Sequence, residues 1–265
     1  MPSCSLLIST YNWPEALTLC LKSILLQSQM PDEIIICDDG SGKETEEVIN
    51  EFAKQCPVKV KHTWHPDEGF QLAKIRNRGF AAAASDYLIQ ADGDLIFHKD
   101  FVRDHIAFSR EGSFATGSRV LLSPATTASL MQHSSIDIKK HAKGDANFMN
   151  GLHLPFLSSL FAERYKQSGK YRYYVKGCNM AFWKKDLEKV NGYNETFTGW
   201  GREDSELAIR LINAGIGKRF IKFAGICYHL YHKEASREME ARNIKLMEDA
   251  VSQRLVRSPL GMDQY

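Results

Sequence analysis

The amino-acid sequence predicts an α/β fold with a mostly parallel central sheet flanked by helices. Short apolar runs alternate with helix-like segments through the first 100 residues, and the connections between them are short. Acidic residues repeatedly follow the apolar runs, at the edge where ligands collect on a parallel sheet. With 265 residues, of which 43% are hydrophobic, the chain can form one large domain with a sizeable core.

The alternating elements can be followed in order. Residues 5–9 are an almost continuous apolar run, typical of a strand buried on both faces. Residues 14–25 begin with a proline and then carry leucine and isoleucine at helical spacing, which predicts a helix. The same criteria predict a strand at 33–37, a helix at 44–54, a strand exposed on one face at 58–62, a helix at 72–84 and a buried strand at 87–91.

Charge and cysteine usage exclude several classes of protein. The chain has 34 Lys and Arg residues against 32 Asp and Glu, a net charge of +2, so nucleic acid is not expected as a partner. The six cysteines form no C-x-x-C pair and no dense framework, which favours buried thiols in a reducing cytosol. No run of about 18 apolar residues occurs, so we expect no transmembrane segment.

Acidic side chains follow two of the predicted strands. Asp38 and Asp39 come directly after residues 33–37, and Asp92 and Asp94 end the run at 87–91. Residues i and i+2 of a strand project to the same side, so Asp92 and Asp94 should converge. Two carboxylates at this edge could hold Mg²⁺ or Mn²⁺ carrying a diphosphate. A simple Asp-Gly-Asp turn would explain the triplet equally well without a metal.

The second half of the chain carries a separate signature around Gly199-Trp200-Gly201. A strand is expected at 176–183 and a turn at 192–195, and Glu203 and Asp204 then open a helix whose buried side includes Leu207. Acidic residues in a first turn favour the helix dipole by about 0.3–1 kcal/mol without any catalytic role. The flanking glycines and Trp200, however, could give a sugar a flat surface to stack on.

The first-half motifs resemble those of the family-2 glycosyltransferases, which have the GT-A fold, a Rossmann-like sheet. The resemblance rests on the order Ser9-Thr10-Tyr11-Asn12, Cys37-Asp38-Asp39-Gly40-Ser41 and Asp92-Gly93-Asp94. It implies that Asp92 faces the ribose and that Asp94 binds the metal. By the same resemblance the donor nucleotide is held by Thr10, Tyr11, Asn12, Asp38, Asp39 and the triplet Asp92, Gly93 and Asp94.

Two further stretches resemble one branch of this family. Residues 68–77 resemble a segment of the chondroitin polymerases that lies beside the nucleotide, which implies donor contacts for Gln71, Arg76 and Asn77; the alternative is a solvated helix face. Residues 199–204 resemble the GWGxED motif of those enzymes and of β-1,4-galactosyltransferases. That motif implies that Asp204 is the catalytic base, that Glu203 is catalytic beside it, and that Trp200, Gly201 and Glu203 contact the acceptor.

A histidine near the C-terminal end of the catalytic domain often completes the metal site in this fold. His229 and His232 are the candidates here, and imidazole suits Mn²⁺. Strand alternation favours His229, whereas the Tyr231-His232-Lys233 run looks more like the chondroitin-polymerase pattern, so both stay open. Beyond Arg237 the apolar spacing predicts a closing amphipathic helix packed on the sheet, and residues after 252 read as a polar tail.

Together these features predict a metal-dependent inverting glycosyltransferase of a single GT-A domain. Residues 1–100 would bind the nucleotide sugar, 101–235 the acceptor, and 236–265 would form the closing helix and tail. The resemblance implies a UDP-linked donor, a saccharide or lipid-linked saccharide acceptor, a Mn²⁺ or Mg²⁺ cofactor, and a cytoplasmic role in bacterial surface-polysaccharide synthesis, with peripheral contact at the inner membrane face. The alternatives are a nucleotidyltransferase or a non-catalytic binding module. The sequence has no G-x-G-x-x-G after its first strand and no P-loop motif, which argues against a dinucleotide or NTPase site.

Overall fold

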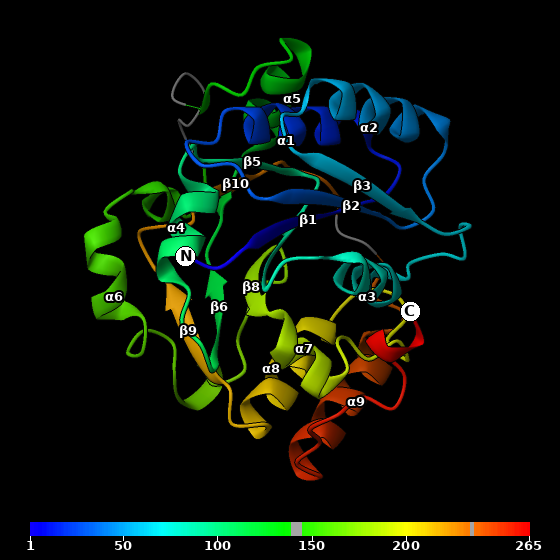
Figure 1. Ribbon diagram of the computed structural model, residues 1–265, viewed down its shortest axis with the longest axis vertical. Helices are drawn as coiled ribbons and strands as arrows, with labels where there is room; N and C mark the ends of the chain where they lie inside the picture. Colours follow the sequence, from blue (N-terminus) through cyan, green and yellow to red (C-terminus); the bar gives the residue numbers. More distant parts are fainter. Residues whose placement is uncertain (139–144, 234–235) are drawn as a thin grey trace.

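The computed structural model describes residues 1–138, 145–233 and 236–265. Its centre is a seven-stranded sheet with the order β3-β2-β1-β4-β8-β6-β9 (Figure 1). Every neighbouring pair is parallel except the two that involve β8, which runs antiparallel to β4 and to β6. The predicted α/β fold with a mostly parallel sheet is therefore confirmed. The strands are β1 (Cys4–Thr10), β2 (Glu33–Asp38), β3 (Lys59–Trp64), β4 (Tyr87–Asp92), β6 (Ser113–Gly117), β8 (Asn179–Trp183) and β9 (Gly217–Ile221).

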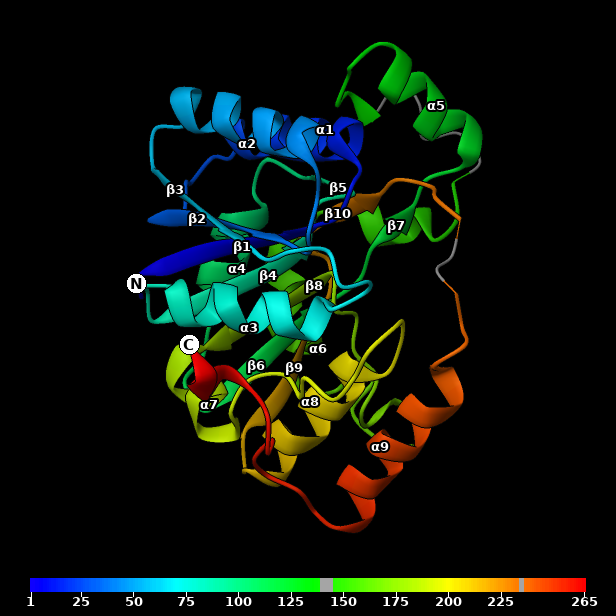
Figure 2. The same ribbon diagram turned by 90° about the vertical axis from the view of Figure 1, so that its right-hand side faces the viewer.

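Helices cover both faces of this sheet (Figure 2). Leu6 and Ile8 of β1 pack in the core cluster shared with α1, while Leu7 between them packs in the cluster on the opposite face. This alternation explains why the strand reads as a continuous apolar run. The helices are α1 (Pro14–Leu25), α2 (Lys43–Gln55), α3 (Leu72–Ala82), α4 (Phe101–Phe108), α5 (Pro124–Gln132), α6 (Ser158–Phe161), α7 (Lys184–Val190), α8 (Glu203–Asn213) and α9 (Glu240–Ser252).

A second, three-stranded sheet brings the C-terminal part of the chain over the end of β4. It consists of β5 (Leu95–Phe97), β10 (Cys227–His229) and β7 (Val120–Leu121), with β10 in the middle. His229 lies opposite Leu95 in the antiparallel β5–β10 pair. The backbone N–H of Leu230 also donates to the carbonyl of Asp94, with 3.0 Å between the heavy atoms. The chain after β10 is thus fixed above the loop that carries Asp92 and Asp94.

Short 3-10 helices lie in the loops between the longer elements and at the C-terminal end. They are η2 (Phe148–Gly151), η3 (Pro155–Leu157), η4 (Gly169–Tyr171) and η5 (Met262–Gln264). Among the described residues, no helix combines the length and the apolar composition that a bilayer-spanning segment requires. All six cysteines are free, and five of them are buried, as expected from their spacing.

The C-terminal region differs from the prediction in two ways. The closing helix, α9, packs on α8 and not on the sheet, because α8 already covers that face. Its fully buried residues are Asn243 and Ala250; Ile244 and Met247 of the predicted apolar face are half-buried, and Val251 is exposed. The tail after 252 is not a free linker: Ser258 and Met262 are buried, and their backbone N–H groups donate to the carbonyls at the end of α7.

Candidate active site

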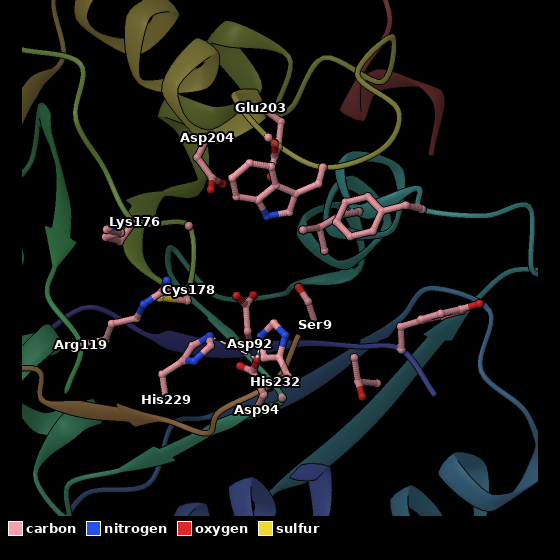
Figure 3. Close-up of a pocket in the computed structure, with 18 of the residues that line it drawn as sticks. Ser9, Asp92, Asp94, Arg119, Lys176, Cys178, Glu203, Asp204, His229 and His232 are labelled. Carbon is pink, nitrogen blue, oxygen red and sulfur yellow. Dashed lines mark hydrogen bonds and ion pairs between the residues drawn. The ribbon is translucent and has the colours of Figure 1, made fainter. Parts of the chain in front are cut away.

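A cavity of about 930 Å³ opens at the carboxyl ends of β1 and β4. Figure 3 shows Asp94, His229 and His232 on one side of it, Glu203 and Asp204 on the other, and Asp92 between the two groups. Segments from both halves of the chain therefore form the same cavity. The predicted site residues that line it are Thr10, Tyr11, Asp39, Arg76, Asp92, Gly93, Asp94, Trp200, Gly201, Glu203, Asp204, His229 and His232.

Asp94, His229 and His232 form a cluster with the geometry of a metal site. The Nε2 atoms of His229 and His232 lie 3.3 Å and 3.1 Å from Oδ2 of Asp94. One ligand atom from each residue lies within 4.8 Å of the others. Strand alternation could not choose between the histidines because β10 ends at His229, and the chain then turns His232 toward the same carboxylate. The structure brings both of them together with Asp94.

The charge state of this cluster suits a divalent cation. Burial lowers the pKa of His229 to about 4, so its imidazole is neutral at pH 7 and offers a lone pair. The hydrogen bond to Asp94 raises the pKa of His232. Burial would raise the pKa of Asp94, but contacts with the two histidines outweigh it and lower that pKa. Oδ1 of Asp94 is buried without a hydrogen-bond partner among the described residues, which a cation would satisfy. The three residues therefore fit a Mn²⁺ or Mg²⁺ ion.

Arg76 links the two sides of the cavity. Its Nη1 donates to Oδ1 of Asp204 and its Nη2 to Oδ1 of Asp92, both over 2.9 Å, and Glu203 lies 4.0 Å away. Its Nε donates to Oγ of Ser9 over 3.3 Å. The side chain is only 2% exposed, so the alternative of a solvated helix face is wrong. One guanidinium thus balances three carboxylates from two separate stretches of the sequence.

Replacement of Arg76 by methionine should destabilise the protein by about 3 kcal/mol, because it leaves the half-buried Asp92 and Asp204 and the buried Glu203 without their counter-charge. Urea unfolding followed by circular dichroism measures this. Arg78→Met on the same helix is the matched control, since Arg78 is only half-buried and donates to the Trp64 carbonyl; we expect a change below about 1 kcal/mol. Equal losses in the two variants would contradict the role assigned to Arg76.

Asp204 is held in a fixed position at the start of α8. Besides Arg76, the hydroxyl of Tyr193 donates to its Oδ1 over 2.7 Å. The opposite side of the carboxylate rests on the backbone of Gly177, where an added Cβ would lie 2.0 Å from Oδ2. A residue with any side chain at position 177 must displace the Asp204 carboxylate. The sequence expected a strand here, but β8 begins only at Asn179, and residues 176–178 form the loop that contacts Asp204.

Because the sequence motif implies that Asp204 is the catalytic base, we expect Gly177→Ala to lower turnover by at least about tenfold; a displacement near 1 Å at a reacting group can cost about a hundredfold. Gly217→Ala is the control: its Cβ would meet nothing closer than 3.7 Å, and its backbone is not left-handed. Initial transfer rates of both variants measure the effect, and we expect Gly217→Ala to keep the wild-type rate. Full activity of Gly177→Ala would show that Asp204 need not stay where it lies.

Glu203 is buried beside Asp204. Burial, followed by the charge of Asp204, raises the pKa of Glu203 to about 7. Oε2 of Glu203 has no hydrogen-bond partner among the described residues, as expected for a carboxyl held in a poorly solvated position. Glu203 therefore carries a proton over part of the neutral range, in contrast to an ordinary surface glutamate.

This raised pKa makes stability depend on pH. Between the ordinary value of 4.5 and about 7, the folded state holds a proton that the unfolded chain has released. The free energy of unfolding should therefore fall as pH rises through that window, with a slope on the order of 1.4 kcal/mol per pH unit at most. Glu203→Gln should flatten this slope in urea titrations, whereas Glu44→Gln, on the exposed first turn of α2, should leave it unchanged. An unaltered slope in Glu203→Gln would contradict the assignment.

Some predicted donor residues do not reach the cavity. Asp38 is buried, accepts the backbone N–H of Ser41 over 2.8 Å and lies 3.1 Å from Nε2 of His62. Asn77 is buried and bonded to both backbone groups of Tyr193. Because these polar atoms are used within the protein, direct donor contacts predicted for Asp38 and Asn77 do not fit this arrangement.

Asn12 and Gln71 likewise serve the loops around the cavity. The side chain of Asn12 accepts the backbone N–H of Gly42 over 3.0 Å, and the backbone N–H of Gln71 donates to Oδ2 of Asp39 over 3.0 Å. Neither residue lines the cavity, and the direct donor contacts predicted for them stay predictions. Asp39 itself does line it; burial raises its pKa to about 6, and His65 Nε2 lies 3.0 Å from Oδ1.

Sequence reasoning missed several lining residues. Arg119 is mostly buried and donates to Sγ of Cys178 over 3.3 Å. Trp13 packs edge-on against His232 with 5.8 Å between ring centroids. Lys176 and Phe70 also line the cavity. No local sequence pattern predicts that Arg119 lines the cavity. Arg119 lies just after β6, and the position of β6 in the sheet could not be predicted from the sequence.

Comparison with known families agrees with this geometry. The family described as glycosyl transferase family 2 matches residues 5–189, more than half of the chain. The chain belongs to glycosyl transferase family 2. A second family, described as the N-terminal domain of galactosyltransferase, matches residues 158–233 of this family-2 chain. The family inferred from the sequence motifs is confirmed.

Named relatives and a solved structure extend the comparison. The family-2 chain is 27% identical over 246 residues to the chondroitin synthase of Escherichia coli, covering 85% of this chain and 34% of the relative. It is 28% identical over 245 residues to the hyaluronan synthase of Pasteurella multocida, covering 87% of this chain and 24% of the relative. The chain thus spans about a quarter to a third of the length of these relatives.

The solved structure is the mannosyltransferase PcManGT from Pyrobaculum calidifontis in complex with GDP-Man and Mn²⁺. It matches the family-2 chain with a TM-score of 0.64 and 17% identity, covering 97% of this chain and 66% of that one. At this identity the likeness establishes the fold, and the predicted GT-A architecture is confirmed.

Proposed function

We propose that this family-2 domain is a metal-dependent inverting glycosyltransferase. It transfers a hexosyl or N-acetylhexosaminyl group from a nucleotide sugar, UDP-linked by resemblance to the chondroitin-polymerase branch, to a saccharide acceptor. One observation carries the proposal: a candidate metal cluster and a fixed carboxylate face each other across a single cavity. An in-line displacement at an anomeric carbon needs a base on one side and stabilisation of the departing diphosphate on the other.

The donor side is formed by the N-terminal half and by the residues after β10. Thr10, Tyr11 and Asp39 contact the nucleotide, and Asp92 faces the ribose. Asp94, His229 and His232 hold a Mn²⁺ or Mg²⁺ ion. When bound, the ion neutralises the charge that develops on the diphosphate, so this leaving group needs no protonation. That is why one carboxylate near the acceptor suffices, in contrast to the pair in a glycosidase.

The acceptor side is formed by α8 and the turn before it. Asp204 accepts the proton of the attacking hydroxyl through Oδ2, since Arg76 and Tyr193 both hold Oδ1. Glu203 hydrogen-bonds the acceptor, and Trp200 with Gly201 forms a platform for its ring. The guanidinium of Arg237 lies 5.1 Å from the centre of the Trp200 ring, so the acceptor stacks on the face that Arg237 leaves open.

The wider biology rests on the same proposal. The similarity to chondroitin and hyaluronan synthases favours polysaccharide synthesis in a bacterium, with a saccharide or lipid-linked saccharide acceptor and a cytoplasmic location at the inner membrane face. We propose that residues 1–100 form a donor half, residues 101–235 an acceptor half and residues 236–265 a C-terminal part. His229 and His232 are exceptions within the acceptor half, because they lie with Asp94 on the donor side.

A screen of the purified protein tests this function. UDP-, GDP- and dTDP-sugars are each supplied with and without Mn²⁺ and with a panel of saccharides, and nucleotide release and thermal shift are measured. We expect Mn²⁺-dependent release with one nucleotide class, faster in the presence of an acceptor. A thermal shift without any turnover would instead favour a non-catalytic binding module. Pyrophosphate release in a parallel assay with nucleoside triphosphates would favour a nucleotidyltransferase.

A further inference from the structure

A second cluster of metal-ligating side chains lies outside the cavity. His98, Asp100 and His153 each place one ligand atom within 4.8 Å of the others. His98 and Asp100 lie in the link between β5 and α4, and His153 lies between η2 and η3. Asp94 and His98 flank β5 at its two ends, so the clusters are separated by about 13 Å along that strand.

His153 is oriented in the way that metal-ligating histidines commonly are. Its Nε2 lies 2.8 Å from Oδ2 of the buried Asp104. Asp104 is fixed in turn, because the same oxygen accepts the backbone N–H of Gly225 over 3.0 Å. A carboxylate that accepts the Nε2 proton holds the ring in the tautomer whose Nδ1 carries a free lone pair.

His98 and Asp100 supply the remaining donor atoms. The backbone N–H of Asp100 approaches Nδ1 of His98 over 3.3 Å, so this nitrogen is the unprotonated one, and a bound ion would replace that long hydrogen bond as the partner of its lone pair. Oδ2 of Asp100 lies 3.8 Å from the same nitrogen. Oδ1 of Asp100 is held separately by the hydroxyl of Ser28. The rings of His98 and His153 are 4.3 Å apart at 38°. Arg103 approaches Oδ2 of Asp100 to 3.1 Å, but its side chain is 48% exposed and can move aside.

We propose that His98, Asp100 and His153 bind a zinc ion, with Asp104 positioning His153. Two imidazole nitrogens and one carboxylate oxygen are a common Zn²⁺ donor set, with water in the fourth position of the tetrahedron. Mg²⁺ and Ca²⁺ prefer oxygen ligands throughout and are disfavoured here.

The zinc ion ties the β5–α4 link to the segment that follows η2. Asn150 of η2 donates to the backbone carbonyl of Arg119 over 3.0 Å, and Arg119 lines the active-site cavity. The second site is therefore linked through η2 to a residue of the cavity wall, and it is separate from the proposed donor metal.

Calorimetric titration of Zn²⁺ into the EDTA-treated protein tests the proposal. The Asp94→Asn/His232→Gln double variant removes the cavity cluster, and we expect it to retain one saturable equivalent of Zn²⁺ and to melt at a higher temperature with Zn²⁺ than without. Adding His153→Gln should lower the affinity by at least about a hundredfold and abolish the melting shift. Adding Asp104→Asn should lower it by about 10–100-fold, the usual cost of losing the partner of a ligating histidine. Adding His133→Gln, an exposed histidine on another surface, should change nothing.

Two results would overturn the proposal. One is the absence of saturable Zn²⁺ binding in the double variant, and the other is an unchanged stoichiometry and affinity after His153→Gln. If His153→Gln does not fold, Asp100→Asn in the same background replaces it, because it removes one ligand oxygen while preserving the side chain's shape. Undiminished Zn²⁺ affinity in that variant would equally exclude the site.

Discussion

Replacing Asp204 by asparagine should abolish sugar transfer while leaving donor binding near the wild-type value. Asparagine cannot take a proton from an acceptor hydroxyl, and loss of a general base costs about 10²–10⁴-fold in rate. Its amide oxygen can still accept the hydrogen bonds from Arg76 and Tyr193, so the site keeps its shape. Initial transfer rates and calorimetric titration of the donor with Mn²⁺ measure the two effects separately.

A matched variant distinguishes catalysis from helix electrostatics. Asp186→Asn removes a carboxylate from the first turn of α7, outside the cavity, and should leave the rate unchanged. If both variants lost activity alike, the acidic residues would act through helix stability. Near wild-type turnover by Asp204→Asn would rule out Asp204 as the base.

Replacing Asp94 by asparagine should remove the metal dependence of donor binding. The substitution takes the charge from the one carboxylate that both His229 and His232 face. Electrostatic stabilisation by a bound cation contributes several kcal/mol, so turnover should fall by at least about a hundredfold. Donor affinity measured at increasing Mn²⁺ concentrations should become independent of the ion. The position of Asp204 on the other side of the cavity should not change.

Asp86→Asn is the control for this variant, because Asp86 is exposed before β4, at the opposite end from Asp94. We expect it to behave as wild type. Retention of Mn²⁺-dependent donor binding by Asp94→Asn would place the metal elsewhere.

The strands and helices that position the site could be predicted from sequence because their signals are local. The run at 5–9 and the helix from Pro14 depend on spacing within a dozen residues, and both occur as expected. That Asp39 and Asp92 line the same cavity followed from a general property of parallel sheets. The prediction of one shared edge required no knowledge of side-chain contacts.

The remaining features depend on partners distant in sequence. Arg76 and Asp204 are 128 residues apart, and no local pattern shows that they pair. Asp38 and Asn77 carry the right functional groups, but His62 and Tyr193 occupy them. His232 reaches Asp94 because β10 ends at His229, three residues earlier, and the chain beyond it no longer follows strand alternation.

The most direct test of the account is a crystal structure with UDP and Mn²⁺, using anomalous scattering to locate the ion. We expect an anomalous peak within coordination distance of Asp94 and at least one of His229 and His232, in contact with the diphosphate and across the cavity from Asp204. A manganese peak away from Asp94, or UDP bound outside this cavity, would contradict the proposed site.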